Sequence, residues 1–390
     1  MKLHETRNTA LALIGLGALT VYILACTSFS PDDTKVLYPA FDPKTGQMGI
    51  WVYDRNAARS EPVFTPVWFE DSTNKAPPLL QRPQWSPDGR RILIAWQGGD
   101  DDVLHLATVP FRQPGAVTVW ALPGVEEAGT RLVYPLTVVG WRVLVADSER
   151  IHRLDLATGE LVRHEGDTNI ALYPSSVPGQ VLYVENAEGA EGRATIGRMN
   201  PSTFARTPLM VVTNKLDDGQ VALSPDATRV AHVPEQDEQT QLIVLRAGRT
   251  ELTRTLNAPS EKLRVGVLLF DPGGTRLFAP FMSQEQGHTN VAYGVLEIPL
   301  NDRPPGRTIL IREAPEPDDD EMAPSFFQAG LSNDRKTLAI ASTYLACLKA
   351  HGPFKAQDCA LFLVDLSDPG RKVKKIAIPL PAEQLPPVLQ

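Results

Sequence analysis

The sequence predicts an all-β fold, a single β-propeller, and three observations lead to that prediction. The chain holds 34 prolines among 390 residues, spread along its length, which leaves few stretches long enough for helices. A hairpin motif centred on a Pro-Asp turn recurs along the chain. Short strands of alternating polarity group into units of about 49 residues, near the length of propeller repeats. The composition, 43% hydrophobic and 22% charged, excludes a disordered chain.

The amino-terminal segment has the proportions of a secretory signal peptide. Lys2 and Arg7 precede an uncharged stretch of sixteen residues that runs from Ala10 to Ala25. This stretch is shorter than the roughly 20 residues that a membrane-spanning helix needs. We therefore expect residues 1–25 to be a signal peptide, with a plain signal anchor as the alternative.

The end of this stretch, Ile23-Leu24-Ala25-Cys26, resembles the bacterial lipobox. The resemblance implies that Cys26 becomes the acylated amino terminus of the mature chain, tethered to a lipid bilayer by chains that contribute roughly 0.8 kcal/mol per buried CH₂. The residue after the cysteine is Thr27 rather than Asp. In Gram-negative lipoproteins this difference indicates the outer membrane, and we expect the protein to face the periplasm. We expect residues 26–34 to be the lipidated cysteine and a polar spacer of the TSFSPDDT type.

A turn motif recurs four times in the rest of the chain. Each copy has a short strand, a Ser or Asp that can cap a turn, a Pro-Asp-like pair and a second aliphatic strand, so each copy predicts a β-hairpin. The turn residues are Ser86, Pro87, Asp88 and Gly89 in the first copy, Ser224, Pro225 and Asp226 in the second, Asp271, Pro272 and Gly273 in the third, and Ser332, Asn333 and Asp334 in the fourth.

Pairs of alternating strands indicate seven units. Each unit is a four-stranded sheet too small to bury both of its faces alone, so closure of seven such sheets into a ring is the expected architecture. Six blades is the alternative, because no strand is evident before Lys35. We expect the final strand, Val373–Ile378, or the segment after it, to complete the first blade. The strand pairs are 36–41 with 49–53, 91–96 with 103–109, 142–146 with 150–155, 180–184 with 194–199, 228–233 with 241–246, 275–281 with 291–297 and 337–343 with 360–365.

The Ser-Pro-Asp-Gly hairpin before an aliphatic strand, clearest from Trp85 to Ile94, resembles the TolB-type propeller repeat of bacterial envelope proteins. The resemblance covers most of residues 35–380 and implies a propeller in the cell envelope, followed by a tail at 381–390. The third and fourth units depart from the motif, with Val139-Gly140-Trp141 and Pro174–Gly179 where the Pro-Asp turn is expected.

Two further cysteines, Cys347 and Cys359, lie in a long insertion of the last unit. Because disulfides persist in exported proteins, we expect the two to pair and to contribute roughly 3 kcal/mol by closing a short loop. Two unpaired thiols are the alternative.

The chain carries no established catalytic motif, with no G-x-S-x-G, H-E-x-x-H, C-x-x-C or P-loop sequence. His105, His152 and His232 fall on or beside predicted strands and suit structural roles, whereas His288 and His351 fall in long connections. Two acidic clusters, 100–102 and 316–321, suit solvated loops, with Ca²⁺ binding as the alternative, so we expect no cofactor. The formal charge of −8 argues against a nucleic-acid partner.

These features predict a membrane-tethered, non-catalytic scaffold that docks another envelope protein through its rim, with the long connections at Ser283–Asn290 and Thr343–Asp358 as the docking loops. The alternative is a propeller that binds or hydrolyses a glycan or peptide at the channel mouth, where the acidic loops and His288 would act. A third reading is a permanent structural subunit of an envelope assembly, which an exposed apolar patch would favour.

Overall fold

The computed structural model describes most of the chain from Thr27 to Ala377. The described residues are 27–41, 48–64, 79–80, 83–97, 104–112, 116–122, 137–139, 141–146, 150–165, 170–175, 177, 179–186, 193–212, 216, 219–234, 241–246, 249–256, 262–266, 268–284, 290–300, 307–315, 329–341 and 360–377. Every regular element among them is a β-strand, and no helix in this part of the chain is long and apolar enough to span a membrane.

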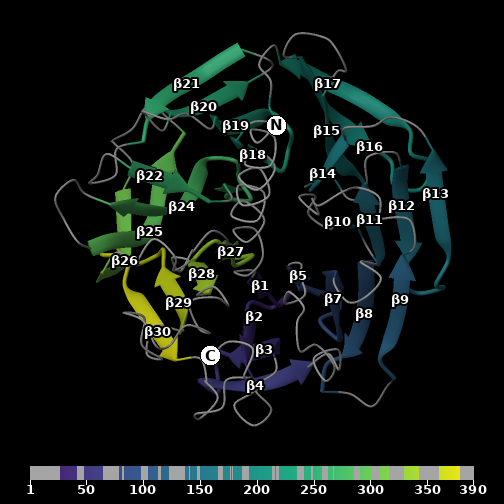
Figure 1. Cartoon of the computed structure of the whole chain (residues 1–390), viewed down its shortest axis with the longest axis horizontal. Coiled ribbons are helices and arrows are strands. Elements are labelled where there is room, and N and C mark those ends of the chain that lie inside the picture. Colours follow the sequence, from purple (N-terminus) through teal and green to yellow (C-terminus); the bar gives the residue numbers. More distant parts are fainter. Residues whose placement is uncertain are drawn as a thin grey trace, which may run out of the picture.

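The strands form seven antiparallel sheets, and each sheet is a blade of a ring (Figure 1). The first three blades hold β1 (Ser28–Phe29), β2 (Lys35–Phe41), β3 (Met48–Asp54) and β4 (Arg59–Phe64); β5 (Leu79–Leu80), β6 (Gln84–Trp85), β7 (Arg91–Gln97), β8 (Leu104–Pro110) and β9 (Thr118–Leu122); and β10 (Thr137–Val139), β11 (Arg142–Ala146), β12 (Arg150–Asp155) and β13 (Leu161–Glu165).

The fourth and fifth blades hold β14 (Ile170–Pro174), β15 (Val181–Asn186), β16 (Ala194–Met199) and β17 (Arg206–Val212); and β18 (Gly219–Leu223), β19 (Arg229–Pro234), β20 (Gln241–Arg246) and β21 (Arg249–Thr255). The last two hold β22 (Lys262–Val265), β23 (Leu269–Phe270), β24 (Arg276–Gln284), β25 (Asn290–Pro299) and β26 (Arg307–Pro315); and β27 (Ala329–Leu331), β28 (Thr337–Ala341), β29 (Ala360–Asp365) and β30 (Val373–Ala377).

The prediction of a seven-bladed propeller is therefore confirmed, and the alternative of six blades is wrong. Each blade is a simple meander of four strands. In the second and sixth blades the first strand is interrupted, so that β5 and β6 both pair with β7, and β22 and β23 both pair with β24.

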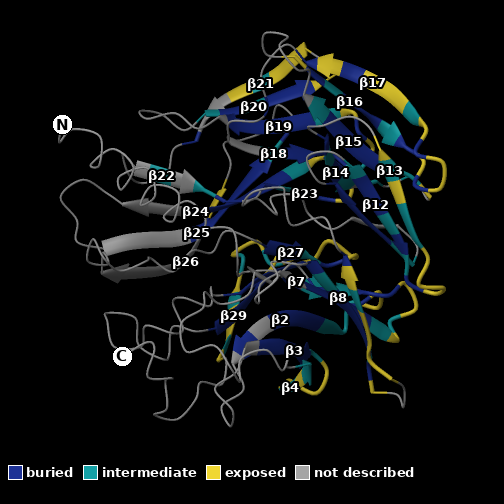
Figure 2. Cartoon of the chain, turned by 45° about the vertical axis from the view of Figure 1, so that its right-hand side comes forward, coloured by how far each residue is buried: buried dark blue, intermediate teal, exposed yellow. Residues whose placement is uncertain are grey.

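The core lies between neighbouring blades, because each sheet packs its apolar side chains against the next sheet. The second strand of the last blade, β28, is buried at every residue, whereas its outermost strand, β30, has no buried residue. Figure 2 shows the same gradient in the fourth and fifth blades, with exposed residues along β17 and β21 outside buried inner strands. The burial gradient explains why the inner strands read as continuous aliphatic runs.

The meander gives the ring two distinct faces. We call the end that holds the turns from first to second strand and from third to fourth strand the turn face. We call the opposite end the entry face, because the first strand of each blade begins there, each second strand ends there and each third strand begins there. The described turns, such as Ser86–Arg91 and Asp155–Glu160, all lie on the turn face.

Among the described strands, none is exchanged between the first and last blades. Strand β30 pairs with β29 and is the fourth strand of the last blade, so the expectation that the carboxy-terminal strand completes the first blade is wrong. The first blade obtains its innermost strand from β1, which pairs with β2 through Ser28 opposite Leu37 and Phe29 opposite Val36. This strand falls within the segment expected to be a spacer, so the fold begins earlier than Lys35.

Packing and side-chain hydrogen bonds join the two ends of the chain. One hydrophobic cluster combines residues of the first, second and last blades, among them Val36, Ile94 and Leu361. Asp33 accepts hydrogen bonds from the backbone nitrogens of Asn333 and Asp334, each at 2.8 Å. In the described part of the chain these contacts, and not a shared strand, join the first and last blades.

Candidate functional site

The turn face carries a network of polar side-chain contacts, and the main element of this network is a repeated serine-carboxylate turn. In four blades a Ser hydroxyl donates to the Asp carboxylate two residues later and accepts a hydrogen bond from the backbone N–H five residues later. The hydroxyl-to-carboxylate distances are 2.5 Å for Ser30–Asp32, 2.6 Å for Ser86–Asp88, 2.7 Å for Ser224–Asp226 and 2.6 Å for Ser332–Asp334. The local sequence of the motif thus specifies a closed hydrogen-bond network within each turn.

The sixth blade reaches the same geometry with a single residue. Asp271 takes the place of the serine, and its Oδ1 accepts hydrogen bonds from the backbone nitrogens of Thr275 at 2.6 Å and Arg276 at 2.9 Å. The fourth residue of all five turns has a left-handed backbone, with φ between 57° at Asp33 and 69° at Gly89. Glycine fits that conformation without strain, which explains its presence in the clearest copy of the motif.

The hydrogen bonds keep the turn carboxylates ionised. The Ser30 hydroxyl is the main cause that lowers the pKa of Asp32 to about 2, and the Ser86 hydroxyl lowers the pKa of Asp88. Burial acts to raise the pKa of Asp226, but hydrogen bonds from Ser224 and Thr228 outweigh it and the net shift is downward. Carboxylates with lowered pKa values that already accept these bonds are poor proton donors at neutral pH.

A second set of turns joins the third and fourth strands on the same face. The side-chain oxygens of Asp54, Asp155, Asn200 and Asp365 each accept hydrogen bonds from the backbone nitrogens two and three residues later. These Asx turns explain why the third strands of the first, third and last blades end in an acidic residue. Their side-chain oxygens, like those of the first set, have structural partners.

Arginines cross from blade to blade over this face. Among the described residues they bridge six of the seven interfaces, and their acceptors are backbone carbonyls, hydroxyls and carboxylates of the adjacent blade. The crossings are Arg55 to Thr337, Arg112 to Glu61, Arg142 to Ser202, Arg198 to the Asp226 carbonyl, Arg229 to the Gly274 carbonyl and Arg371 to Glu297. At these six interfaces the crossings tie the turns of adjacent blades together and give the face a charged, hydrogen-bonded frame.

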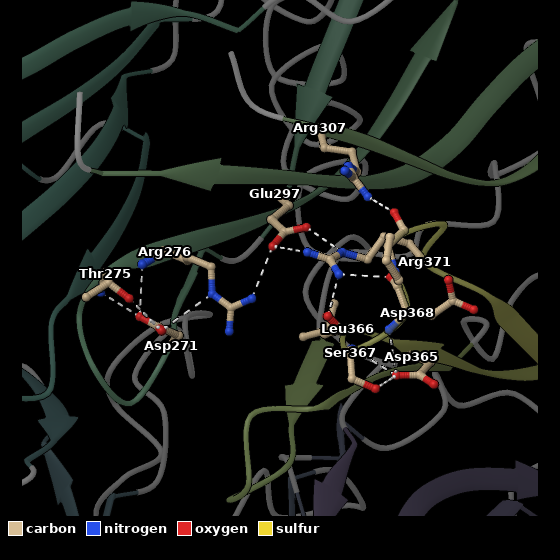
Figure 3. Close-up of polar contacts among 11 residues, drawn as sticks. Asp271, Thr275, Arg276, Glu297, Arg307, Asp365, Leu366, Ser367, Asp368 and Arg371 are labelled. Atoms are coloured by element: carbon tan, nitrogen blue, oxygen red, sulfur yellow. Dashed lines mark hydrogen bonds and ion pairs between the residues drawn. The ribbon is translucent and has the colours of Figure 1, made fainter. Parts of the chain in front are cut away.

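One of these crossings centres on the buried Glu297 (Figure 3). Only 7% of its side chain is exposed. Its carboxylate accepts hydrogen bonds from Arg371 at 2.8 Å (Nε) and 3.0 Å, and from Arg276 at 3.1 Å. Arg276 also lies 3.6 Å from the carboxylate of Asp271, so charge alternates along the row. A row of alternating charges with bidentate geometry is a structural clamp between the sixth and last blades.

The sequence-predicted site residues separate into two groups. The turn residues of all four predicted copies lie on the turn face, where the structure brings them into a ring. Cys26, Cys347 and Cys359 lie outside the described residues, and so do His288, His351 and both acidic clusters. His152 and His232 are buried in strands β12 and β19. Among the described residues no three His, Cys, Asp or Glu side chains are grouped so that they could hold a metal ion.

Sequence reasoning missed two parts of this face. Ser30-Pro31-Asp32 has the same sequence as Ser86-Pro87-Asp88 and forms the same turn. A fifth copy of the motif could therefore have been predicted within the segment assigned as spacer. The inter-blade arginines had no such signal, because their acceptors are residues far away in the sequence or backbone carbonyls.

Comparisons with known proteins agree with the fold. No protein-family model matches the chain, and no curated protein matches it. Solved structures that match include the Swd1 (Cps50) propeller of Myceliophthora thermophila, with 11% identity, a TM-score of 0.50 and coverage of 83% of this chain and 95% of that one. A Bacteroides uniformis protein named as a candidate 6-phosphogluconolactonase matches with 13% identity, a TM-score of 0.50 and coverage of 89% and 97%.

The TolB protein of Acinetobacter baumannii also matches, with 15% identity, a TM-score of 0.43 and coverage of 71% of this chain. The match spans 63% of the TolB chain, so less than two thirds of that protein is represented. At identities this low the likeness extends to the fold alone. The chain is a seven-bladed β-propeller, and its relation to the TolB family remains a prediction.

Proposed function

We propose that this protein is a lipid-anchored, non-catalytic propeller scaffold of the bacterial cell envelope, tethered through Cys26 and docking another envelope protein. The observation that carries the proposal is that charged groups of the turn face are engaged in structural hydrogen bonds. Carboxylates of this face such as Asp88, Asp271 and Glu297 accept hydrogen bonds from hydroxyls, turn nitrogens and arginines, and arginines join the blades at six interfaces. Groups engaged in this way favour a rigid frame that presents a surface, rather than a site that exchanges protons with a substrate.

The lipid anchor is supported by sequence. The lipobox-like Ile23-Leu24-Ala25-Cys26 stands at the end of the apolar stretch, directly before the first described residue, Thr27. Acylation there would place the scaffold at a membrane surface, and Thr27 after the cysteine favours the outer membrane. The docking loops of this proposal are the connections Ser283–Asn290 and Thr343–Asp358.

Affinity capture from detergent-solubilised envelopes tests the docking role. The bait is the full-length lipoprotein, compared with Cys26→Ser and with a chain that lacks residues 345–358. Arg90→Ala is the matched control, because Arg90 is exposed on the turn face. We expect one envelope protein to be lost on deletion of the loop, to be retained by Arg90→Ala, and to bind again when both proteins are purified. Equal capture by every bait would contradict the docking loops, and turnover of a glycan or peptide in hydrolase screens would contradict the non-catalytic role.

A further inference from the structure

Three arginines stand opposite one another across the fifth blade. The registers place Arg229 of β19 opposite Arg246 of β20, and Arg246 opposite Arg249 of β21. Directly opposite residues of antiparallel strands point to the same face of the sheet, with Cβ atoms about 4.5–5.5 Å apart. We call these three residues the arginine row. It lies where three neighbouring strands meet the turn face (Figure 1).

The arginine row repeats one charge where other blades pair opposite charges. At the same register position Lys35 lies opposite Asp54 in the first blade. In the third blade Arg142 lies opposite Asp155. No other pair of described strands places two like charges directly opposite each other. Because like charges at such positions destabilise a sheet, the stability of the fold does not account for this row.

Among the described residues, one carboxylate pairs with the arginine row. Glu251 lies at a bulge of β21, since Thr250 and Leu252 pair with consecutive residues of β20 on either side of it. Its two oxygens accept hydrogen bonds from Arg229 at 2.7 Å and 3.1 Å. Arg246 lies 3.6 Å from the same carboxylate. Glu251 therefore serves Arg229 fully and Arg246 only through a longer ion pair.

Two guanidinium groups of the arginine row are left to solvent. The side chain of Arg246 is 60% exposed. Arg249 is exposed and forms no hydrogen bond or ion pair with another described residue. Asp226 adds a negative charge near Arg229, but its carboxylate accepts hydrogen bonds within its own turn. Because a guanidinium is a planar fork of donors that matches a carboxylate, the two exposed forks can bind carboxylates from outside the chain.

The surroundings of the arginine row favour an anionic partner, although the whole chain has a charge of −8. We counted the described residues of the fourteen turns on the turn face, from the last residue of one strand to the first residue of the next. They include 17 Lys and Arg and 11 Asp and Glu, a balance of +6. Strand side chains that pair with these turns add four glutamates and two arginines, and the balance stays positive at +4. Screening limits charge interactions to about 10 Å at 0.1 M salt, so a partner responds to this face rather than to the whole chain.

We propose that the arginine row is a docking point for an acidic segment of a protein partner, whose carboxylates bind Arg246 and Arg249. A bilayer surface or a nucleic acid is a uniform polyanion. It would also bring phosphates against Asp88 and Asp226, which stay ionised because hydrogen bonds lower their pKa values. A protein segment can place carboxylates at the row and neutral groups elsewhere, which avoids this repulsion. Neither the anchor nor the docking loops of the proposed function belong to this site.

Binding of a fluorescein-labelled hexaglutamate peptide to the full-length chain in non-ionic detergent tests the site. Fluorescence anisotropy at about 20 mM NaCl reports the affinity. We expect Arg246→Glu/Arg249→Glu to weaken binding about tenfold or more. Lys372→Glu/Lys375→Glu, the same change of charge on exposed residues of the last blade, should weaken it less than about twofold. No binding to the wild-type chain, or equal losses in the two variants, would overturn the proposal.

Two further measurements separate the alternatives. Displacement of the peptide by polyphosphate at a lower concentration of charge than by unlabelled hexaglutamate would overturn the choice of a protein segment. Thermal unfolding of the free chain distinguishes docking from a structural role and verifies that each variant folds. Arg249→Gln removes a like charge opposite Arg246, so we expect weaker peptide binding with a thermal midpoint equal to or above that of the wild type. A lower midpoint would show that Arg249 supports the fold and would overturn the inference.

Discussion

Arg371, in the last blade, donates to both carboxylate oxygens of Glu297 in the sixth blade, from Nε at 2.8 Å and from a terminal nitrogen at 3.0 Å. Arg276 adds a third hydrogen bond from within the sixth blade. The two arginines are separated by 95 positions in sequence and meet on one carboxylate that is almost fully buried. This clamp is a strong polar link between two adjacent blades, since bidentate pairs shielded from water exceed exposed single contacts.

Removal of the charge at this clamp should destabilise the protein strongly. Glu297→Gln leaves two arginines facing a neutral amide in a site shielded from water, and we expect a loss on the order of 3 kcal/mol in the free energy of unfolding by urea. Glu251→Gln is the matched control, because Glu251 also binds Arg229 through two nitrogens but within one blade and with 25% of its side chain exposed. A loss of about 1 kcal/mol or less is expected there. Similar losses in the two variants would argue against a special role of the blade interface.

The closure of the ring should be sensitive to a single methyl group at Gly330. In Gly330→Ala the new Cβ meets the oxygens of Thr27 at 2.6 Å, so we expect a loss of about 1–3 kcal/mol and a lower thermal midpoint. In Gly273→Ala the new Cβ also has a contact at 2.6 Å, but with the end of the exposed Arg335 side chain, which can move aside. We expect a change within about 0.5 kcal/mol for that control. A tolerated Gly330→Ala would mean that Thr27 is not held against Gly330 of β27 and Ala339 of β28.

The serine of the repeated turn should contribute more than its small size suggests. Ser332 is fully buried, and its hydroxyl accepts from the backbone nitrogen of Thr337 and donates to Asp334. Ser332→Ala leaves a buried N–H without that acceptor, and we expect a loss of about 2 kcal/mol by urea unfolding. Ser367→Ala removes an exposed hydroxyl that also donates to an Asp, and should cost about 0.5 kcal/mol or less. Equal effects would contradict the role of burial.

The turn carboxylates should make stability depend on acid. The folded pKa of Asp32, about 2, lies below its ordinary value of 3.8, and the pKa values of Asp88, Asp226 and Asp334 are also lowered. The folded state therefore binds fewer protons than the unfolded state, so this stabilisation is complete well above pH 4 and is lost as the pH falls towards 2. We expect the urea midpoint to fall between about pH 5 and pH 2.

The variant Asp32→Asn checks this assignment. It should lower the urea midpoint at pH 7, where the carboxylate contributes, and should approach the wild-type midpoint at the acid end, where the carboxylate is protonated in both states. Parallel curves for the two proteins between pH 7 and pH 2 would contradict a contribution from the lowered pKa of Asp32.

The sequence alone was sufficient to predict the seven blades. The turns at Ser86–Gly89 and Asp271–Gly273 depend on side chains and backbone groups within five residues of one another. A short stretch of sequence is therefore enough to predict them. Alternating aliphatic runs on either side of each turn then specify the strands, and the number of such pairs specifies seven blades. Even the misassigned Ser30-Pro31-Asp32 carried the same local signal.

Only the tertiary structure decided how the ring closes and which side chains join neighbouring blades. Thr27 bonds to Ala339, and Asp33 to Asn333, across about three hundred residues, and Arg371 finds Glu297 in another blade. Such contacts leave no short-range pattern, because any arginine or threonine satisfies the local sequence and the partner is selected by the packing of sheets. The segment after the lipobox-like cysteine was expected to be a flexible spacer, and only the packing of the sheets shows that Thr27 is buried against the last blade.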